Sequence, residues 1–140
     1  MSLASIFDIA GSGMTAQSIR LNAISSNIAN AESVGRTAED TYKAKLPLFS
    51  AIQKKIALDG SIHASNGVQV LDVVDSKDPP LLRYEPNHPF ADKNGYVSYP
   101  NISVVEQMTD MLSASRSMQS NIDVFDTAKT LMQRMLALGE

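Results

Sequence analysis

Apolar residues recur at alternating intervals of four and three residues near both ends of the chain. Near the N-terminus the series is Leu3, Phe7, Ala10, Met14, Gln17, Leu21, Ile24 and Ile28. Near the C-terminus it is Val104, Met108, Met111, Ser115, Met118, Ile122, Phe125, Lys129, Met132 and Leu136. An average spacing of 3.5 residues keeps such side chains on one side of an α-helix over many turns. The pattern therefore predicts two long helices that each need a partner helix.

The N-terminal helix is expected to run from Leu3 to Asn30 and to end among the Asn, Ser and Gly residues at 30–35. Gly11 and Gly13 would each cost this helix about 1 kcal/mol relative to Ala. Glycines also let another helix approach closely. We therefore expect a helix that becomes stable only when it packs against a partner.

The C-terminal helix has the clearest start in the chain. Ser103 and Glu106 form a capping box, in which the Ser103 hydroxyl accepts from the Glu106 amide and the Glu106 side chain reaches back. From residue 104 to about residue 138 nothing interrupts the helix, which predicts a length of about 50 Å. A compact domain of this size has a radius of gyration of about 14 Å. The helix must therefore project from the domain or lie along another structure.

The side chains on this second helix favour packing against partners. Five of the seven methionines fall in it, and methionine adapts to irregular apolar grooves. Gln17, Ser115 and Lys129 occupy positions in the two series that otherwise favour apolar groups. Such polar residues cost stability but specify the register and the partner.

The middle of the chain carries strand and turn patterns. Asn66-Gly67 suits a type I′ hairpin turn. Candidate strands are residues 61–65, 68–74, 81–84 and 96–99, and residues 48–56 could form a strand or a short helix. The predicted class is α+β: long N- and C-terminal helices forming a coiled-coil-like hairpin or layer, with a small β-rich middle domain. We expect three regions, an N-terminal helix at 1–35, a β-rich region at 36–95 and a C-terminal long helix at 96–140.

Composition excludes several classes of function. The chain has no Cys, so disulfides and thiolate chemistry are unavailable. A net charge of −3 gives no basic surplus for tracking phosphates, which disfavours nucleic-acid binding. The chain contains no run of 18 apolar residues, which is the length that would predict a membrane span. The first positive charge is Arg20, so the N-terminus lacks the basic start of a secretory signal. Any route out of the cytosol is therefore expected to cleave no leader.

No catalytic, cofactor-binding or metal site is expected. His63 and His88 are the only histidines, and neither has a second ligand at metal spacing. Gly11-Ser12-Gly13 lacks the preceding strand and the Lys of a phosphate-binding loop, so helix packing explains it better. The acidic residues of the middle region are scattered over strands and loops as solvated charges. An enzyme is the least supported class.

Two blocks of sequence carry a more specific signal. Residues 17–31 read QSIRLNAISSNIANA, and residues 94–116 read NGYVSYPNISVVEQMTDMLSASR. Asn27 and Asn30 in the first block are poor helix formers, and their amides could cap the helix or hydrogen-bond a neighbouring backbone. The blocks resemble those of the flagellar axial proteins, and among them the basal-body rod proteins. Residues 32–37 (ESVGRT) depart from the Thr-x-Gly-Tyr-like step of the wider family.

The resemblance implies a structural subunit of the bacterial flagellar basal-body proximal rod. Such subunits leave the cell unfolded through the flagellum-specific type III export apparatus and polymerise through their terminal helices. The rod then transmits torque across the periplasm. Implied partners are other copies of the chain, other rod proteins, the rod-adaptor and membrane-ring proteins and the export apparatus, with no nucleic acid and no membrane insertion. The expected subunit interface comprises Leu3, Phe7, Met14, Leu21, Ile24, Asn27, Ile28, Asn30, Met108, Met111, Met118, Ile122, Phe125, Met132 and Leu136.

One rival class is a secreted helical-hairpin binding protein that forms a small closed oligomer. The helical patterns alone do not separate it from a rod subunit. They also leave open whether the terminal helices pair within one subunit or between subunits.

Overall fold

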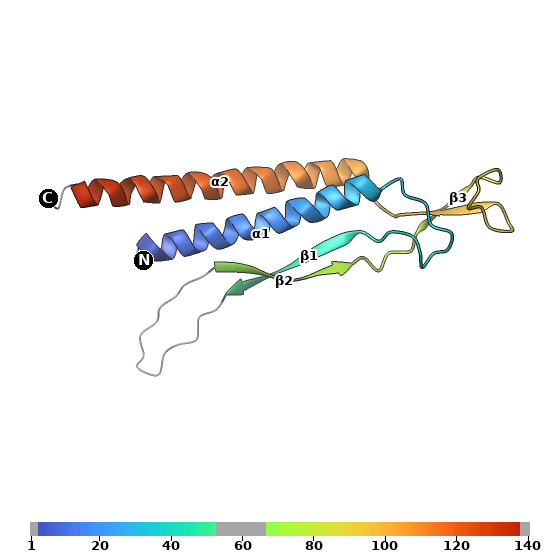
Figure 1. The fold of residues 1–140 in the computed structure, drawn as a ribbon, viewed down its shortest axis with the longest axis horizontal. Coiled ribbons are helices and arrows are strands. Elements are labelled where there is room, and N and C mark those ends of the chain that lie inside the picture. Colours follow the sequence, from blue (N-terminus) through green and yellow to red (C-terminus); the bar gives the residue numbers. More distant parts are fainter. Residues whose placement is uncertain (1–2, 53–66, 138–140) are drawn as a thin grey trace, which may run out of the picture.

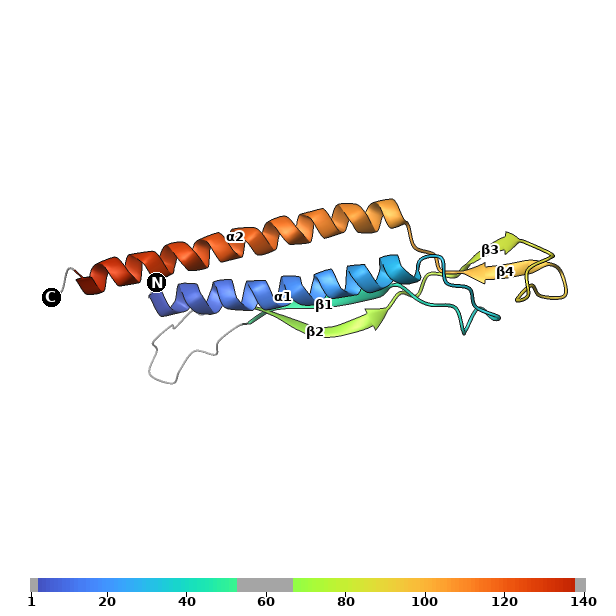
Figure 2. The same ribbon diagram turned by 45° about the horizontal axis from the view of Figure 1, so that its top comes forward.

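The computed structural model describes residues 3–52 and 67–137, and it has three layers along most of its length. Helix α1 (Leu3–Asn30) lies between helix α2 (Val104–Ala137) on one side and a hairpin on the other (Figures 1 and 2). The hairpin consists of β1 (Lys45–Ile52) and β2 (Gly67–Asp75). A second pair, β3 (Leu81–Tyr84) and β4 (Tyr96–Tyr99), lies at the far end from the start of α1 and the end of α2. The α+β class is confirmed.

Strands β1 and β2 pair antiparallel, from Lys45 opposite Asp75 to Ile52 opposite Gly67. Of the region 48–56 that could have been strand or helix, residues 48–52 are strand, and this strand begins before Pro47, while residues 53–56 lie outside the described part of the chain. Pro47 is tolerated there because a two-stranded sheet consists only of edge strands. The expected hairpin between residues 61–65 and 68–74 is corrected in part: β2 pairs with β1, while residues 61–66 lie outside the described part of the chain.

Strands β3 and β4 form where the sequence patterns predict them, with Leu81 opposite Tyr99. The loop between them returns through Gly95, whose φ of 83° favours glycine. One Asp92 carboxylate oxygen accepts from the amides of Asn94 and Tyr96 at 2.8 and 2.9 Å. The pair spans the expected boundary at residue 95, and the division of the chain into three regions stays a prediction.

The chain after α1 is tied to β4 by a short junction. The Gly35 amide donates to the carbonyl of Ser98 at 3.0 Å. The Thr41 hydroxyl donates to the carbonyl of Thr37 at 2.8 Å and lies 2.8 Å from the Ser98 hydroxyl. Gly35, Thr41 and Ser98 are all buried. The junction thus connects the end of the first helix to the strand that leads into the second.

Helix α2 begins where the capping box predicts. The Ser103 hydroxyl accepts from the Glu106 amide at 3.4 Å, and the Ser103 carbonyl accepts from the Gln107 amide at 3.0 Å. The helix has 34 residues, which corresponds to about 51 Å. It is longer than the 28-residue α1, so the two helices cannot match along their full lengths.

Gly35 gives the first testable prediction. A Cβ at this position would lie 2.7 Å from the backbone nitrogen of Thr41 and 2.8 Å from its Cα. Because backbone cannot move aside cheaply, Gly35→Ala should lower the free energy of unfolding by about 2 kcal/mol. Urea denaturation followed by circular dichroism measures the change.

Gly11→Ala is the matched control. Nothing lies within 4 Å of a Cβ built at Gly11. This change should therefore raise the free energy of unfolding by about 1 kcal/mol through helix propensity. Similar losses in both variants would show that the junction at Gly35 is not special.

Candidate assembly interface

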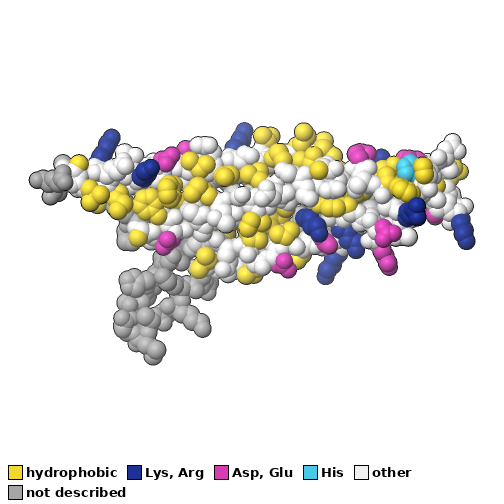
Figure 3. Space-filling view, viewed as in Figure 1, with side chains coloured by type: hydrophobic (Ala, Val, Ile, Leu, Met, Phe, Trp, Pro, Cys, Tyr) yellow, Lys and Arg dark blue, Asp and Glu magenta, His cyan; other side chains and the backbone are white. Residues whose placement is uncertain are grey.

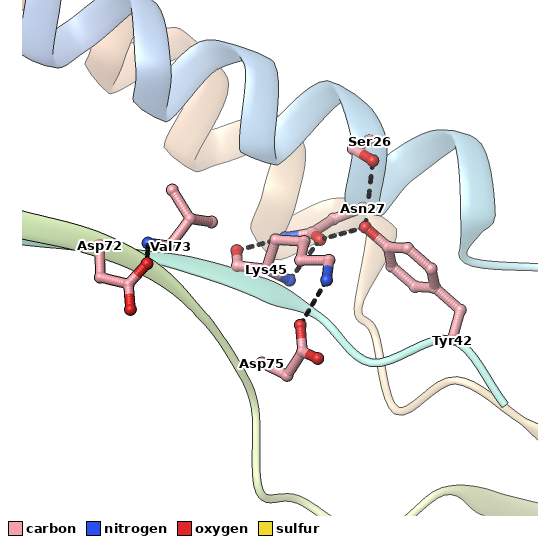
Figure 4. A network of polar contacts seen from close by, with 7 residues as sticks. All are labelled: Ser26, Asn27, Tyr42, Lys45, Asp72, Val73 and Asp75. Atoms are coloured by element: carbon pink, nitrogen blue, oxygen red, sulfur yellow. Dashed lines mark hydrogen bonds and ion pairs between the residues drawn. The ribbon is translucent and has the colours of Figure 1, made fainter. Parts of the chain in front are cut away.

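The side chain of Asn27 connects all three layers. Its Nδ2 donates to the Lys45 carbonyl at 3.1 Å and to Gln107 Oε1 at 3.0 Å. Its Oδ1 accepts from the Lys45 amide at 2.7 Å and from the Tyr42 hydroxyl at 3.1 Å (Figure 4). That hydroxyl is also 3.1 Å from Ser26 Oγ. Asn27 is 1% exposed, and every donor and acceptor position of its amide is used within the chain.

Asn30 has the simpler role. Its Nδ2 donates to the carbonyl of Ser26 at 2.8 Å, which caps the last turn of α1. The sequence allowed these amides either to cap the helix or to hydrogen-bond a neighbouring backbone. Asn30 caps the helix, and Asn27 hydrogen-bonds the backbone of β1. Sequence reasoning missed Tyr42, Lys45 and Gln107 as partners of Asn27, because no pattern relates these positions to it.

Helices α1 and α2 pair antiparallel within one chain. The rings of Phe7 and Phe125 meet edge to face with centroids 4.9 Å apart. Further along, a Cβ built at Gly13 would lie 2.8 Å from Asn121 Nδ2. Arg20 Nη2 then lies 3.1 Å from Asp110 Oδ1. In this structure the pairing of α1 with α2 is therefore intramolecular.

The side of α2 that faces α1 is only partly the expected one. Met111, Met118 and Phe125 of the expected series are half-buried, and Phe125 contacts Phe7 of α1. The positions between them are corrected by one residue: Gln107, Ala114, Asn121 and Ala128 face α1, whereas Met108, Ser115 and Lys129 are exposed. Small or polar residues take these inward positions because they let the two helices lie close together.

The expected interface residues divide into three groups. Ile24 and Asn27 are buried within the chain. Phe7, Met14, Leu21, Ile28, Asn30, Met111, Met118, Ile122 and Phe125 are half-buried. Met108, Met132 and Leu136 are exposed, and the side chain of Leu3 lies outside what the structure describes.

Small apolar side chains make up most of the buried core, whereas many large ones are exposed on the surface. Among the described residues, six of the nine buried apolar residues are alanines: Ala10, Ala16, Ala23, Ala31, Ala114 and Ala128. Helix α2 in contrast exposes eight large apolar residues: Val105, Met108, Leu112, Val124, Leu131, Met132, Met135 and Leu136. Figure 3 shows hydrophobic side chains gathered over the first turns of α2 and over its end. Most of this exposed set was missed, although Val105, Met108 and Leu112 repeat the same three–four spacing.

The described residues offer no chemistry for metal binding. No three His, Asp or Glu side chains among them are grouped as a metal site needs. His88 accepts a hydrogen bond at Nδ1 from the Phe90 amide at 3.1 Å, and His63 lies outside the described residues. Neither helix, within the ranges 3–52 and 67–137, has an apolar stretch that could cross a membrane.

Two regions of the chain match known protein families. A family described as flagella basal body rod protein matches residues 7–35, and one described as flagellar basal body rod FlgEFG protein C-terminal matches residues 93–138. The flagellar basal-body rod proteins FlgC of Escherichia coli and Salmonella typhimurium are each 47% identical to this chain over 140 residues, covering all of both chains. That of Borreliella burgdorferi is 36% identical, covering 99% of this chain and 98% of that protein.

The chain belongs to the FlgC family. A chain of this family is a structural rod subunit of the flagellar basal body, which confirms the function expected from the sequence. The closed-oligomer alternative gains no support from these relatives. The two matched regions of the FlgC-family chain are the ones that meet in the fold, since 7–35 contains most of α1 and 93–138 contains β4 and α2.

The Asn27 network gives the second prediction. Asn27→Ala would leave the backbone amide and carbonyl of Lys45, the Tyr42 hydroxyl and the side-chain oxygen Oε1 of Gln107 without their partner. The free energy of unfolding should fall by about 3 kcal/mol, because each buried unpaired group costs about 1–3 kcal/mol. Chemical denaturation measures the loss. Asn22→Ala, at an exposed position of the same helix, should change stability by no more than about 0.5 kcal/mol.

Two side chains bind their proton more tightly in the folded chain. A hydrogen bond to Asp75, 2.5 Å from Lys45 Nζ, raises the pKa of Lys45 above its ordinary value of 10.5. Burial raises the pKa of Tyr99 above its ordinary value of 10.0, and the hydrogen bond from its hydroxyl to Glu85 Oε2 at 3.1 Å adds to this. Both effects favour the protonated form in the folded state.

Stability should therefore decrease in alkali. A raised pKa contributes stability that is fully present below the ordinary value and is lost as the pH rises through the folded value. The urea midpoint should fall above about pH 10. Tyr99→Phe should make that fall shallower, whereas Tyr84→Phe, at an exposed position of β3, should not. A midpoint that rises above pH 10 would contradict the assignment.

Proposed function

We propose that this FlgC-family chain polymerises into the proximal part of the basal-body rod through the exposed apolar side chains of α2. The observation that carries the proposal is the inverted distribution of size, with alanines inside and large apolar residues outside. Burying one large apolar side chain contributes about 1.5–3 kcal/mol. The eight that α2 exposes would therefore contribute to association wherever a neighbouring copy buries them.

The geometry of this surface supports an open assembly. Val105, Met108 and Leu112 lie near the start of α2, and Leu131, Met132, Met135 and Leu136 lie near its end. Two different surfaces on one chain make heterologous contacts between copies, and such contacts build helical filaments when the rotation does not close. A rod is such a filament.

The paired helices suit a part that carries torque. Phe7 with Phe125 and Arg20 with Asp110 hold α1 against α2 at two levels. The Asn27 amide adds bonds to Gln107 of α2 and to the backbone of β1. Sliding one layer past another would break several of these contacts at once. We propose that torque passes along this helix pair and that the hairpin is carried on it.

The location and partners are proposed from the same family membership. We place the subunit in the rod that crosses the periplasm, in contact with other copies of itself, other rod proteins, the rod adaptor and the membrane rings. Delivery is proposed to proceed through the flagellar export apparatus. Of the interface residues expected from the sequence, Met108, Met132 and Leu136 are proposed to contact neighbours directly. The half-buried residues are proposed to complete the interface when a neighbour covers their edges.

Leu112 tests the proposal. It is 63% exposed, so Leu112→Asp should change the free energy of unfolding by less than about 0.5 kcal/mol. The variant should nevertheless fail to enter isolated basal bodies, and cells that carry it should lose motility. Ile122 is a poorer probe, because it is half-buried beside α1 and a charge there would disturb the chain's own packing.

Ser113→Asp is the matched control for Leu112→Asp. It adds the same charge at an adjacent exposed position, about 100° around the helix from Leu112. Normal motility with Leu112→Asp, or equal loss with both variants, would count against the proposed surface.

A further inference from the structure

Helix α2 continues past the start of α1. Ala128 is the last buried residue of α2, and residues 129–137 are all exposed. Within this segment Met132 and Met135 continue the four–three spacing of Met118, Asn121, Phe125 and Ala128, the residues that face α1. We call residues 129–137 the overhang. Its apolar face is the α1-facing side of α2 prolonged beyond the end of its intramolecular partner.

The overhang is positively charged and adjoins an apolar groove. Lys129 and Arg134 are its charged residues, and no acidic residue occurs between 127 and 137. Neither forms an ion pair within the described parts of the chain. A groove with a volume of about 320 Å³ adjoins the overhang and is lined by Ile6, Val124, Ala128 and Leu131, among others. The surface therefore suits an apolar or small-residue helix face that carries negative charge.

Such a face is present on α1 of the same chain. Ala4, Asp8, Gly11 and Thr15 follow the i, i+4, i+7 and i+11 positions of one side of the helix. This side faces neither α2 nor the hairpin, since Ala4, Asp8 and Thr15 are exposed and nothing lies within 4 Å of a Cβ at Gly11. Asp8 is the only acidic residue of α1, and it has no ion pair among the described residues.

Building on the proposed function, we propose that the overhang of one copy packs on this Asp8–Gly11 face of α1 in the next copy. Large side chains of α2 would meet small side chains of α1. Lys129 would pair with Asp8 of the neighbour, because it lies about 60° around the helix from Met132, whereas Arg134 lies about 160° away. Because the overhang and the Asp8–Gly11 face are different surfaces, every added copy leaves one of each unoccupied. Such a heterologous contact builds an open filament when the rotation between copies does not close a ring.

Engineered cysteines test the contact directly. The chain has no native Cys, so Gly11→Cys with Met135→Cys introduces the only two thiols. They cannot bond within one chain: Gly13 lies beside Asn121, and Met135 is 14 residues, or about 21 Å, further along α2. A disulfide needs Cα atoms within about 7 Å. Oxidised basal bodies from cells that carry this variant in place of the native chain should give a ladder of covalent dimers, trimers and larger species.

The control pairs Gly11→Cys with Gln133→Cys. Gln133 is exposed in the same turn but lies about 160° around the helix from Met135. Its yield of covalent multimers should be at least about tenfold lower. Equal ladders from both variants would mean random collision and would overturn the proposal.

Charge reversal gives an independent test with the same cysteine pair. Asp8→Lys and Lys129→Asp should each lower the multimer yield about threefold, the size expected for an exposed ion pair. The two together should restore it to within about twofold of the parent. Additive loss in the double variant would overturn the assignment of this ion pair and with it the proposed register.

The outcomes separate this inference from the proposed function. Variant chains that enter basal bodies and support motility without cross-linking would overturn the contact and leave the rod subunit in place. Dimers without larger species would show a closed contact and would also overturn it. If the native chain did not enter basal bodies, the proposed function itself would be wrong.

Discussion

The buried amide of Asn27 is the interaction on which the arrangement of layers depends. A two-stranded hairpin is marginally stable by itself, so β1 and β2 need a fixed attachment to α1. Asn27 supplies it by bonding both the amide and the carbonyl of Lys45, the first residue of β1. The same side chain reaches Gln107 in the first turn of α2. One residue thus sets where the hairpin starts along α1 and where α2 begins beside it.

The small side chains of α1 are the complement of that attachment. Ala10, Ala16, Ala23 and Gly13 let α2 and the hairpin approach the helix from two sides. Close approach of backbones leaves little room inside for large apolar groups, and those of α2 therefore stay on its outer faces and at its end. A chain built in this way gains modest stability from its own core and retains its strongest apolar surfaces for contacts with neighbours. The proposal of a polymerising subunit rests on this division.

Much of this fold could be predicted from local patterns, because local chemistry determines it. Helix α1, strands β3 and β4 and the start of α2 follow from spacing, turn residues and the Ser103 cap. The pairing of β1 with β2 could not be predicted, since nothing local at residues 45–52 distinguishes β2 from another strand. On α2, Met111, Met118 and Phe125 of the expected series are half-buried, whereas the fully buried positions are Ala114 and Ala128 and not Ser115 and Lys129. Hydrophobicity alone favours Met108 over Gln107, whereas the partners Asn27 and α1 favour the smaller or polar group.

The same comparison explains why the overhang is informative. A four–three pattern indicates a partner wherever it occurs, and for α2 that partner is α1 only as far as Ala128. Met132 and Met135 keep the pattern where no helix of the described residues lies beside them. If the pattern served only intramolecular pairing, nothing would favour apolar residues at these exposed positions, and four large ones there would carry a solubility cost. A four–three pattern that continues beyond the end of α1 therefore indicates a second partner helix in the assembly. The Asp8–Gly11 face of α1 offers the matching size and charge within the same sequence.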